Sequence, residues 1–306
     1  MAFAELTARL PEWGRLFDAP SYAAFIDTVH AEMAARGVPF EMHDGYLRIS
    51  RAQDSGPSPD WDLPLLPLAQ RCAGEGPLRW PALVKEELER RVAEEKLGRE
   101  LDAVRGDFEK ARPVLKLRVQ RADTLGAGAI SAPITGDLKA VLVLDLPSFV
   151  TPVRAADLAA WERPAEALVG LALENVKAQE HVELKPMEIA GTRIYAISGK
   201  SVFVATLGLA ADDLLGAPTE FGALVAMPSG HILLAHSIVD RRSLRALEAM
   251  AAGALEAFEG GPSPLTPHLM WKRGDRFVAL PVRREDGEVK CELPRSFDEE
   301  VVAKLH

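Results

Sequence analysis

Asp145 is the acidic residue whose position in the sequence best suits chemistry. It stands near the end of the apolar run 140–146, two residues before Pro147. Open α/β sheets often bind ligands beside the ends of buried strands, so Asp145 is a candidate catalytic acid. The alternative, which we favour, is a carboxylate that accepts hydrogen bonds from nearby backbone amides ahead of the proline.

Two histidines are candidate helpers of such an acid. His231 and His236 flank one predicted strand and are five residues apart. A flat strand directs them to opposite faces, so they do not bind one metal ion together. We expect each to be a hydrogen-bonded structural histidine. Ser229 lies in a predicted turn beside His231. The two residue types are those of a nucleophile and its base, but residues so close in a hairpin seldom point at each other.

Three further acids, Asp212, Asp213 and Asp240, stand at predicted helix starts. Acids there interact favourably with the free backbone amides of the first turn. If three acids including Asp145 converged in space, their oxygens would suit a divalent cation. The sequence contains no zinc-protease motif and no paired-cysteine spacing. We therefore expect neither a resident metal nor another cofactor.

The segment Gly199-Lys200-Ser201 ends like a phosphate-binding loop. That loop requires a glycine five residues before Gly199, where Ile194 stands instead. The segment also lies between two predicted strands, 194–197 and 202–206, rather than between a strand and a helix. We therefore predict a hairpin turn here and no nucleotide site.

The net charge bears on the classes of partner. The 306-residue chain has 36 basic and 45 acidic residues, a formal net charge of −9. This field repels phosphate backbones, so we expect no nucleic-acid binding. No apolar run approaches the roughly 20 residues that span a membrane. With no secretory signal and only 2 cysteines, a cytoplasmic protein is expected.

Helical patterns dominate the first third of the chain. We expect Ser21 to cap a helix that Gly37 ends. A hairpin over residues 40–50 follows. Pro81 then begins a long helix to about residue 112, with one apolar stripe against dense charges. The sequence therefore predicts a helix-rich N-terminal lobe over residues 1–112.

Strand patterns dominate after Pro113. Alternating or continuous apolar segments predict strands at 114–119, 140–146, 194–197, 202–206, 221–227, 232–239, 269–271 and 276–280. The predicted fold is α+β (mixed α/β), a mostly antiparallel sheet with flanking helices, preceded by the N-terminal lobe. The sheet and its helices form a body over residues 113–281, and residues 282–306 form a C-terminal tail.

Three segments follow one another along the chain in a recognisable order. They are Val143-Leu144-Asp145-Leu146, Ala172-Leu173-Glu174-Asn175-Val176 and Ala226-Met227-Pro228-Ser229. In this order the chain resembles the YtpQ-like family of uncharacterised bacterial proteins over the larger part of its length. It departs from the family in the loop 53–60 and after Pro281. The family has no assigned reaction, so the resemblance implies a fold and a bacterial cytosolic setting but no site residues.

These observations favour a non-enzymatic protein-binding or scaffold protein of the bacterial cytosol. Trp61 and Trp80 lie near proline-containing loops and are candidate partner-binding residues, because exposed tryptophans often anchor interfaces. One alternative is a metal-dependent hydrolase-like enzyme that uses Asp145 with nearby acids or a histidine. Another is an immunity- or effector-related protein whose acidic face blocks a basic surface. The partner's identity and the oligomeric state remain open.

Overall fold

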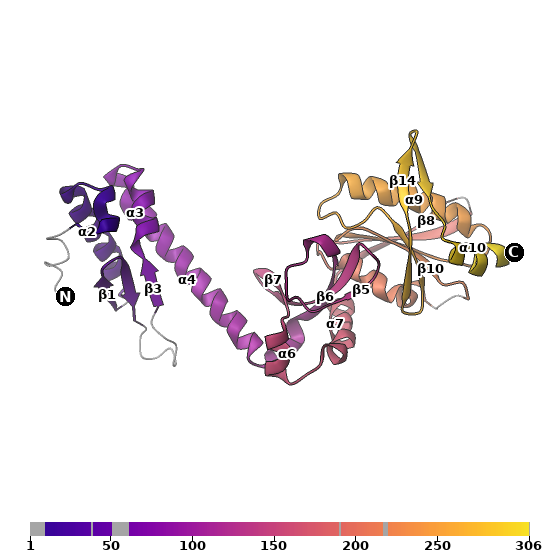
Figure 1. Cartoon of the computed structure of the whole chain (residues 1–306), viewed down its shortest axis with the longest axis horizontal. Coiled ribbons are helices and arrows are strands. Elements are labelled where there is room, and N and C mark those ends of the chain that lie inside the picture. The colour runs from indigo at the N-terminus through magenta and orange to yellow at the C-terminus, as the bar shows by residue number, and fades with distance from the viewer. Residues whose placement is uncertain (1–9, 38, 51–60, 190, 217–219, 306) are drawn as a thin grey trace. The chain divides into compact units, whose positions relative to one another are not determined.

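The computed structural model describes residues 10–37, 39–50, 61–189, 191–216 and 220–305. The chain forms two compact units, Met1–Leu101 and Asp102–His306. Each unit combines helices with antiparallel strands (Figure 1). This confirms the predicted α+β class, with a mostly antiparallel sheet and an N-terminal helical region.

The first unit packs helices against a three-stranded antiparallel sheet of order β1-β2-β3. Its core contains a cluster of rings, with Phe17 stacked on Phe25 at 5.2 Å and edge-on to Trp80 at 5.5 Å. The predicted hairpin is confirmed as β1 and β2. The elements are η1 (Glu12–Leu16), α2 (Ala19–Ala35), β1 (Phe40–His43), β2 (Tyr46–Ile49), β3 (Trp61–Pro64), α3 (Leu65–Ala73) and η3 (Pro77–Arg79).

Asp18, rather than Ser21, caps α2. The Asp18 carboxylate accepts a hydrogen bond from the backbone amide of Ser21 at 2.9 Å. The helix begins earlier than predicted, and its first turn includes Pro20. Proline is well tolerated there, since the first amides of a helix have no partner within it.

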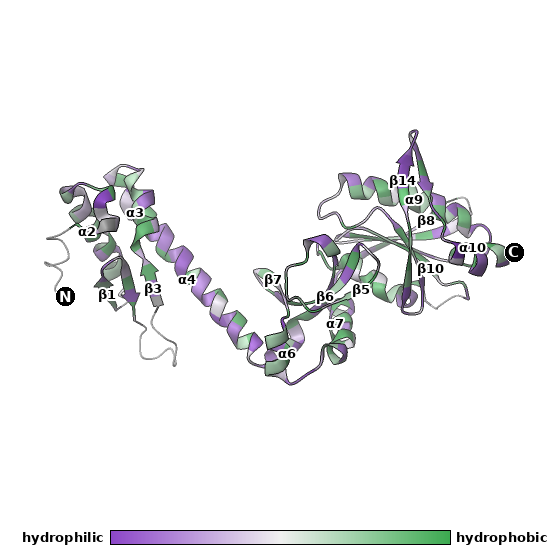
Figure 2. Ribbon diagram, viewed as in Figure 1, coloured by the Kyte–Doolittle hydropathy of each residue, from purple (hydrophilic) through white to green (hydrophobic). Residues whose placement is uncertain are grey.

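Helix α4 (Trp80–Arg105) buries side chains only in its first turns, up to Leu88. The rest is mostly hydrophilic (Figure 2) and carries ion pairs three or four residues apart, such as Glu95–Arg99 at 3.5 Å. Such pairs stabilise a helix locally by about 0.2–0.5 kcal/mol each. The predicted single helix to residue 112 is wrong at its end. Gly106 interrupts it, and Asp107 caps the separate short helix α5 (Phe108–Ala111).

The second unit is built on two antiparallel sheets. The large sheet has the order β13-β12-β10-β11-β9-β8. Its strands are β8 (Glu183–Ile189), β9 (Thr192–Ser198), β10 (Ala223–Ser229), β11 (Ile232–Ser237), β12 (Leu269–Arg273) and β13 (Arg276–Leu280). In the small sheet β6 is central, with β4 on one side and β5 and β7 on the other. These strands are β4 (Leu115–Arg121), β5 (Ser131–Pro133), β6 (Leu138–Leu146) and β7 (Phe149–Pro152).

Helices and short strands cover these sheets. The remaining elements of the second unit are η4 (Arg112–Val114), η5 (Ala122–Thr124), α6 (Ala155–Trp161), α7 (Ala165–Gln179), η6 (Val204–Ala210), α8 (Ala211–Leu215), α9 (Ser243–Gly260), β14 (Val282–Glu285), β15 (Glu288–Cys291), α10 (Arg295–Glu300) and η7 (Val302–Lys304). Within the described ranges, no helix is both long enough and apolar enough to cross a bilayer.

Strand β10 is buried on both faces, and its residues alternate between two cores. Leu224 and Ala226 pack with α9 and Trp271. Val225 and Met227 pack on the other face, in a core that includes η6 and residues of the small sheet. The alternation follows from the two-residue period of a strand. It explains why residues 221–227 lack the polar positions of a half-exposed strand.

The C-terminal segment packs into the second unit. Val282, Phe297, Val301 and Leu305 share a core with Trp271, whose ring meets Phe297 edge-on at 5.4 Å. The predicted division at residues 112 and 281 therefore differs from the observed one. The two units divide at Leu101, within α4, and residues 282–306 do not form a separate part.

The predicted strand 202–206 is wrong. Its residues lead into the 3-10 helix η6, where Val204, Ala205 and Leu207 are buried in the core beneath the large sheet. The hairpin partner of β9 is instead β8, with Ile189 opposite Thr192. The valines suggested a strand, but tertiary burial overrides the local preference of so short a segment.

We predict that Gly222→Ala destabilises the second unit by about 2–4 kcal/mol. Gly222 has φ +79°, and an added Cβ would overlap the carbonyl oxygen of Lys272. Urea unfolding measures the change. Gly136→Ala is the control, because its Cβ would meet open space, and we expect a change within about 0.5 kcal/mol. Equal stability of the two variants would contradict the packing of Gly222.

Candidate functional site

Asp145 is held by a lysine at the edge between β4 and β6. The Nζ of Lys116 lies 2.8 Å from a carboxylate oxygen of Asp145 and 2.7 Å from one of Glu180. Lys116 and Glu180 side chains are each only 6% exposed. The ammonium also lies 4.7 Å from the centre of the Phe203 ring. The Asp145 side chain is 29% exposed and is a partner of this buried lysine, in place of the predicted role as an acceptor for backbone amides.

Opposing effects act on the Lys116 ammonium. Burial alone would lower its pKa, but hydrogen bonds and charges from Asp145 and Glu180 outweigh burial and raise the pKa above its ordinary value. Lys116 therefore stays charged at neutral pH. Its ammonium occupies the position between the two carboxylates that a metal ion would need, which argues against a metal site at Asp145.

The other predicted acids do not converge on Asp145. Asp212 is paired with Lys272, Asp213 with Lys177 and Asp240 with Arg242, each through its own ion pair. Among the residues that the structure describes, no three His, Cys, Asp or Glu side chains are grouped to hold a metal ion. The convergence on which the metal-dependent hypothesis relied is therefore not found in the described part of the chain.

His231 and Ser229 form no catalytic pair. His231 lies in the turn between β10 and β11, and its backbone amide donates to the Ser229 hydroxyl at 3.2 Å. Ser229 is fully buried. The contact therefore stabilises the turn through the backbone, and the imidazole of His231 takes no part in it.

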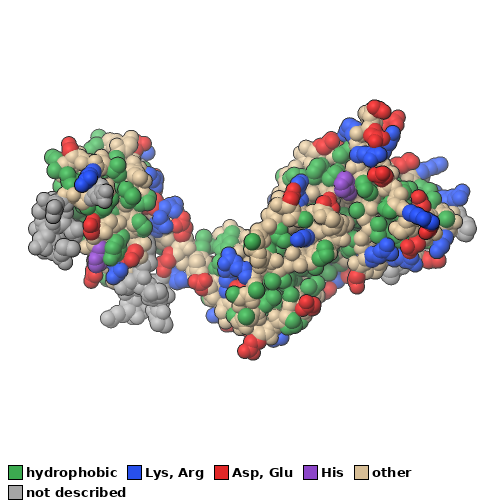
Figure 3. Space-filling model, viewed as in Figure 1, with side chains coloured by type: hydrophobic (Ala, Val, Ile, Leu, Met, Phe, Trp, Pro, Cys, Tyr) green, Lys and Arg blue, Asp and Glu red, His purple; other side chains and the backbone are tan. Residues whose placement is uncertain are grey.

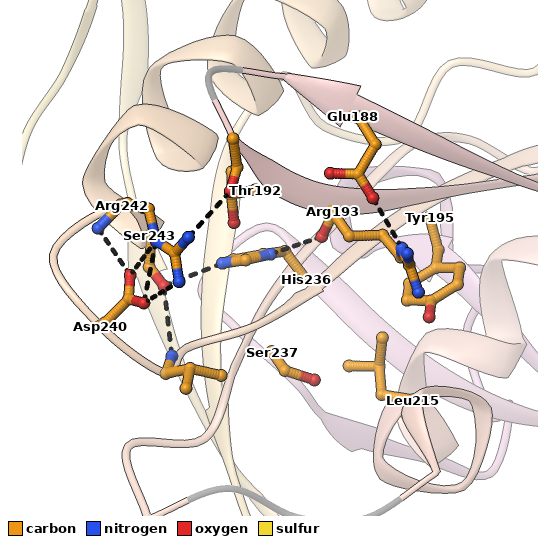
Figure 4. Close-up of a pocket in the computed structure, with 12 residues that line it drawn as sticks. Glu188, Thr192, Arg193, Tyr195, Leu215, His236, Ser237, Asp240, Arg242 and Ser243 are labelled. Carbon is orange, nitrogen blue, oxygen red and sulfur yellow. Dashed lines mark hydrogen bonds and ion pairs between the residues drawn. The ribbon is translucent and has the colours of Figure 1, made fainter.

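His236 connects β11 to β9 and α9. Its Nδ1 lies 2.7 Å from the carbonyl oxygen of Arg193, and its Nε2 lies 2.9 Å from the hydroxyl of Ser243 (Figure 4). A carbonyl can only accept, so Nδ1 carries the proton and Nε2 accepts from Ser243. Burial lowers the pKa of His236, although Arg193 and Asp240 act in the opposite direction. The imidazole is therefore neutral, as a structural histidine requires.

The Ser243–His236 pair has the donor–acceptor order of a nucleophile and its base. Ser243 is, however, only 3% exposed, and its hydroxyl also accepts from the backbone amide of Val239 at 3.2 Å. The hydroxyl thus fixes the turn that leads into α9. We infer a structural role for the pair, because a substrate has little access to the oxygen.

A cavity of about 360 Å³ lies beside this pair (Figure 4). Two ion pairs line it, Glu188–Arg193 at 2.9 Å and Asp240–Arg242 at 2.5 Å. Each guanidinium is thus already neutralised by a carboxylate. The cavity is hydrophilic and balanced in charge, and it does not present a free cation to an anionic ligand.

Of the two tryptophans predicted as partner anchors, the structure places the side chain of Trp80 only, and it lies in the core. Trp80 is 3% exposed, and its Nε1 donates to the carbonyls of Cys72 and Glu75 at 2.8 and 3.2 Å. Its ring belongs to the core of the first unit and is not available to a partner. The side chain of Trp61 lies outside the described residues.

The two cysteines are free thiols. Cys72 is fully buried and Cys291 is partly buried. Burial raises the pKa of each thiol to about 11, the nearby Arg71 only partly opposing this at Cys72. Little thiolate forms at neutral pH, so neither is suited to act as a nucleophile.

Sequence reasoning missed an apolar groove in the second unit. A cavity of about 140 Å³ opens between β5 and the start of α7. Its floor is the face of the small sheet that carries Leu117, Ala140 and Leu142, and α7 contributes Ala165 and Val169. Figure 3 shows apolar side chains gathered on the face of the molecule around α7. The alanines that line the groove, Ala132, Ala140 and Ala165, are well separated in the sequence. They carry no local signal of a groove, because its shape depends on how α7 packs against the sheet.

We predict that Lys116→Met destabilises the second unit by about 3–5 kcal/mol, because two carboxylates lose their buried cation. Chemical denaturation measures the loss. The triple variant Lys116→Met, Asp145→Asn, Glu180→Gln should recover part of it, since no uncompensated charge remains. A loss below about 1 kcal/mol for the single variant would contradict the importance of the cluster.

We predict that acidification from about pH 7.5 to pH 5 weakens the protein through His236. Its folded pKa lies below the ordinary 6.5, so the unfolded state binds the proton more readily. The stabilisation is complete above the unfolded pKa and is lost as the pH falls through the folded one. His236→Asn should be less stable at neutral pH but should lose less on acidification. Equal pH slopes in urea unfolding would refute the assignment.

The chain was also compared with known proteins. No family model, curated protein or solved structure matches it. The resemblance to the YtpQ-like family therefore stays a prediction.

Proposed function

We propose that this chain is a non-enzymatic protein-binding protein of the bacterial cytosol, and that its partner is another protein. The observation that carries the proposal is the apolar groove between β5 and α7. The bacterial and cytosolic setting follows from the family resemblance and the composition, and it belongs to the same proposal.

The groove supports protein binding because it leaves apolar surface in water beside an open strand. Val169, on its α7 wall, is 40% exposed. All three residues of β5 are exposed. Covering apolar surface yields about 25 cal/mol per Å², and protein domains commonly bind partners at a strand edge next to an apolar pocket.

The candidate polar side chains are already engaged by partners within the protein, which supports a non-enzymatic role. The Asp145 carboxylate is engaged by Lys116, and both ring nitrogens of His236 have partners. General acid–base catalysis requires a group that can exchange a proton with a substrate within hydrogen-bond reach. In these two residues the same atoms hold strands and helices together.

We predict that Val169→Lys abolishes capture of the partner. Tagged full-length protein, isolated from its native cell at low salt, should retain one stoichiometric protein, and the variant should retain at least about tenfold less, because a charge replaces an apolar contact. Val239→Lys is the matched control, since Val239 is also exposed but lies beside the cavity of Figure 4. It should behave like the unmodified protein.

Two results would count against this. If the unmodified protein retains no stoichiometric partner, the protein-binding function fails. If Val169→Lys and Val239→Lys lose the partner equally, the loss is not specific to the groove. Circular dichroism and thermal unfolding of both variants separate a folding defect from a lost contact.

A further inference from the structure

We propose that the groove binds an extended segment of the partner that pairs with β5 and inserts one apolar side chain, flanked by a basic residue, between β5 and α7. This inference rests on the proposed protein-binding function and specifies the chemistry of the partner.

The outer edge of β5 has backbone groups available for pairing. β5 pairs with β6 on one side and ends the small sheet. Two bonds bracket it, from the amide of Leu142 to the carbonyl of Ile130 and from the amide of Ile134 to the carbonyl of Leu138. In an antiparallel ladder this alternation turns the backbone of Ser131 and Pro133 away from β6. A partner strand can therefore bond to the Ser131 amide and to the carbonyls of both residues.

The edge is also short, and Pro133 has no amide to donate. Short edge strands and edge prolines are features by which native proteins limit indiscriminate pairing with other strands. Two or three backbone bonds at one edge give little affinity on their own. A side-chain contact is therefore needed to select the partner.

The cavity provides that contact on the α7 side of the same edge. Ala132 lies opposite Ala140, and Leu117 opposite Leu142, so all four residues belong to one face of the small sheet. The two alanines leave a depression because their side chains are small. A cavity of about 150 Å³ holds a benzene ring, so 140 Å³ suits one aliphatic or aromatic side chain.

The charge at the mouth selects a basic neighbour for that side chain. Glu166, in the first turn of α7, lines the cavity and is exposed. It forms no ion pair with any described residue. An unpaired carboxylate beside an apolar pocket, in a chain of net charge −9, attracts lysine or arginine and repels acidic segments.

A second copy of this chain fits the groove less well. Two copies that paired through β5 about a two-fold axis would use the same patch on both subunits. Their Glu166 side chains would then belong to one interface, where like charges repel. The geometry therefore points to a different protein.

The test uses a displayed library of random linear peptides selected on the immobilised full-length protein. We expect enriched peptides to carry an apolar residue next to lysine or arginine. Fluorescence titration of these peptides should show binding at least about tenfold weaker to Val169→Lys. Glu166→Lys should weaken it about three- to tenfold, with a larger effect at low salt. Glu248→Lys is the matched control, an exposed helical glutamate on α9, and should leave binding unchanged.

The inference is overturned if no peptide is enriched, or if the enriched peptides bind Val169→Lys as tightly as the unmodified protein. It is also overturned if sedimentation shows self-association that Glu166→Lys strengthens, because the groove would then bind a second copy. If a partner captured from native cells binds Val169→Lys and Glu166→Lys as tightly as the unmodified protein, the protein-binding function stands and only this inference fails. If peptides that depend on the groove are enriched but no native partner is captured, the inference about the groove stands and the proposed protein-binding function loses its support.

Discussion

The second unit depends on burying both faces of its central strands. Successive residues of β10, such as Leu224 and Val225, pack into two separate cores on opposite faces. Each face therefore needs its own covering layer. Helix α9 covers one face (Figure 1). The other is covered by η6 and the small sheet, which has an outer face of its own. Helix α7 packs against β4 and buries Leu168 and Ala172. Its first turns leave the rest uncovered, and the groove lies there.

The same layering explains where polar groups are buried. Lys116 follows the start of β4, beside the end of β6, and Glu180 immediately follows α7. The cation and its two carboxylates therefore join three segments that the apolar cores bring together. Removing one charge is more damaging than removing all of them, because an unpaired buried charge loses its hydration without compensation. His236 acts in a similar way between β11, β9 and α9, with neutral hydrogen bonds in place of charges.

These arrangements separate stability from recognition. Asp145 and His236, which look reactive in the sequence, make contacts that hold segments of the second unit together. The surface that we propose for a partner is apolar and lies at a sheet edge, where backbone hydrogen bonds would provide pairing and one side-chain pocket would provide selectivity. Glu166, the acid that lines this pocket, would discriminate between partners by charge in the function that we propose. Recognition of this kind requires no catalytic residue, which is consistent with the function that we propose.

The α+β class, the β1–β2 hairpin and the buried run 140–146 follow from the sequence itself, because period-two and period-3.6 apolar patterns report which faces must be buried. Helix ends were less determined, as Asp18 and Gly106 show, since capping depends on one or two residues. The strand predicted at 202–206 became η6 because its burial is decided by the sheet above it. Only the tertiary structure placed Lys116 between two carboxylates and opened the groove at Val169. Both depend on distances between segments far apart in the chain, and no local pattern of residues encodes such distances.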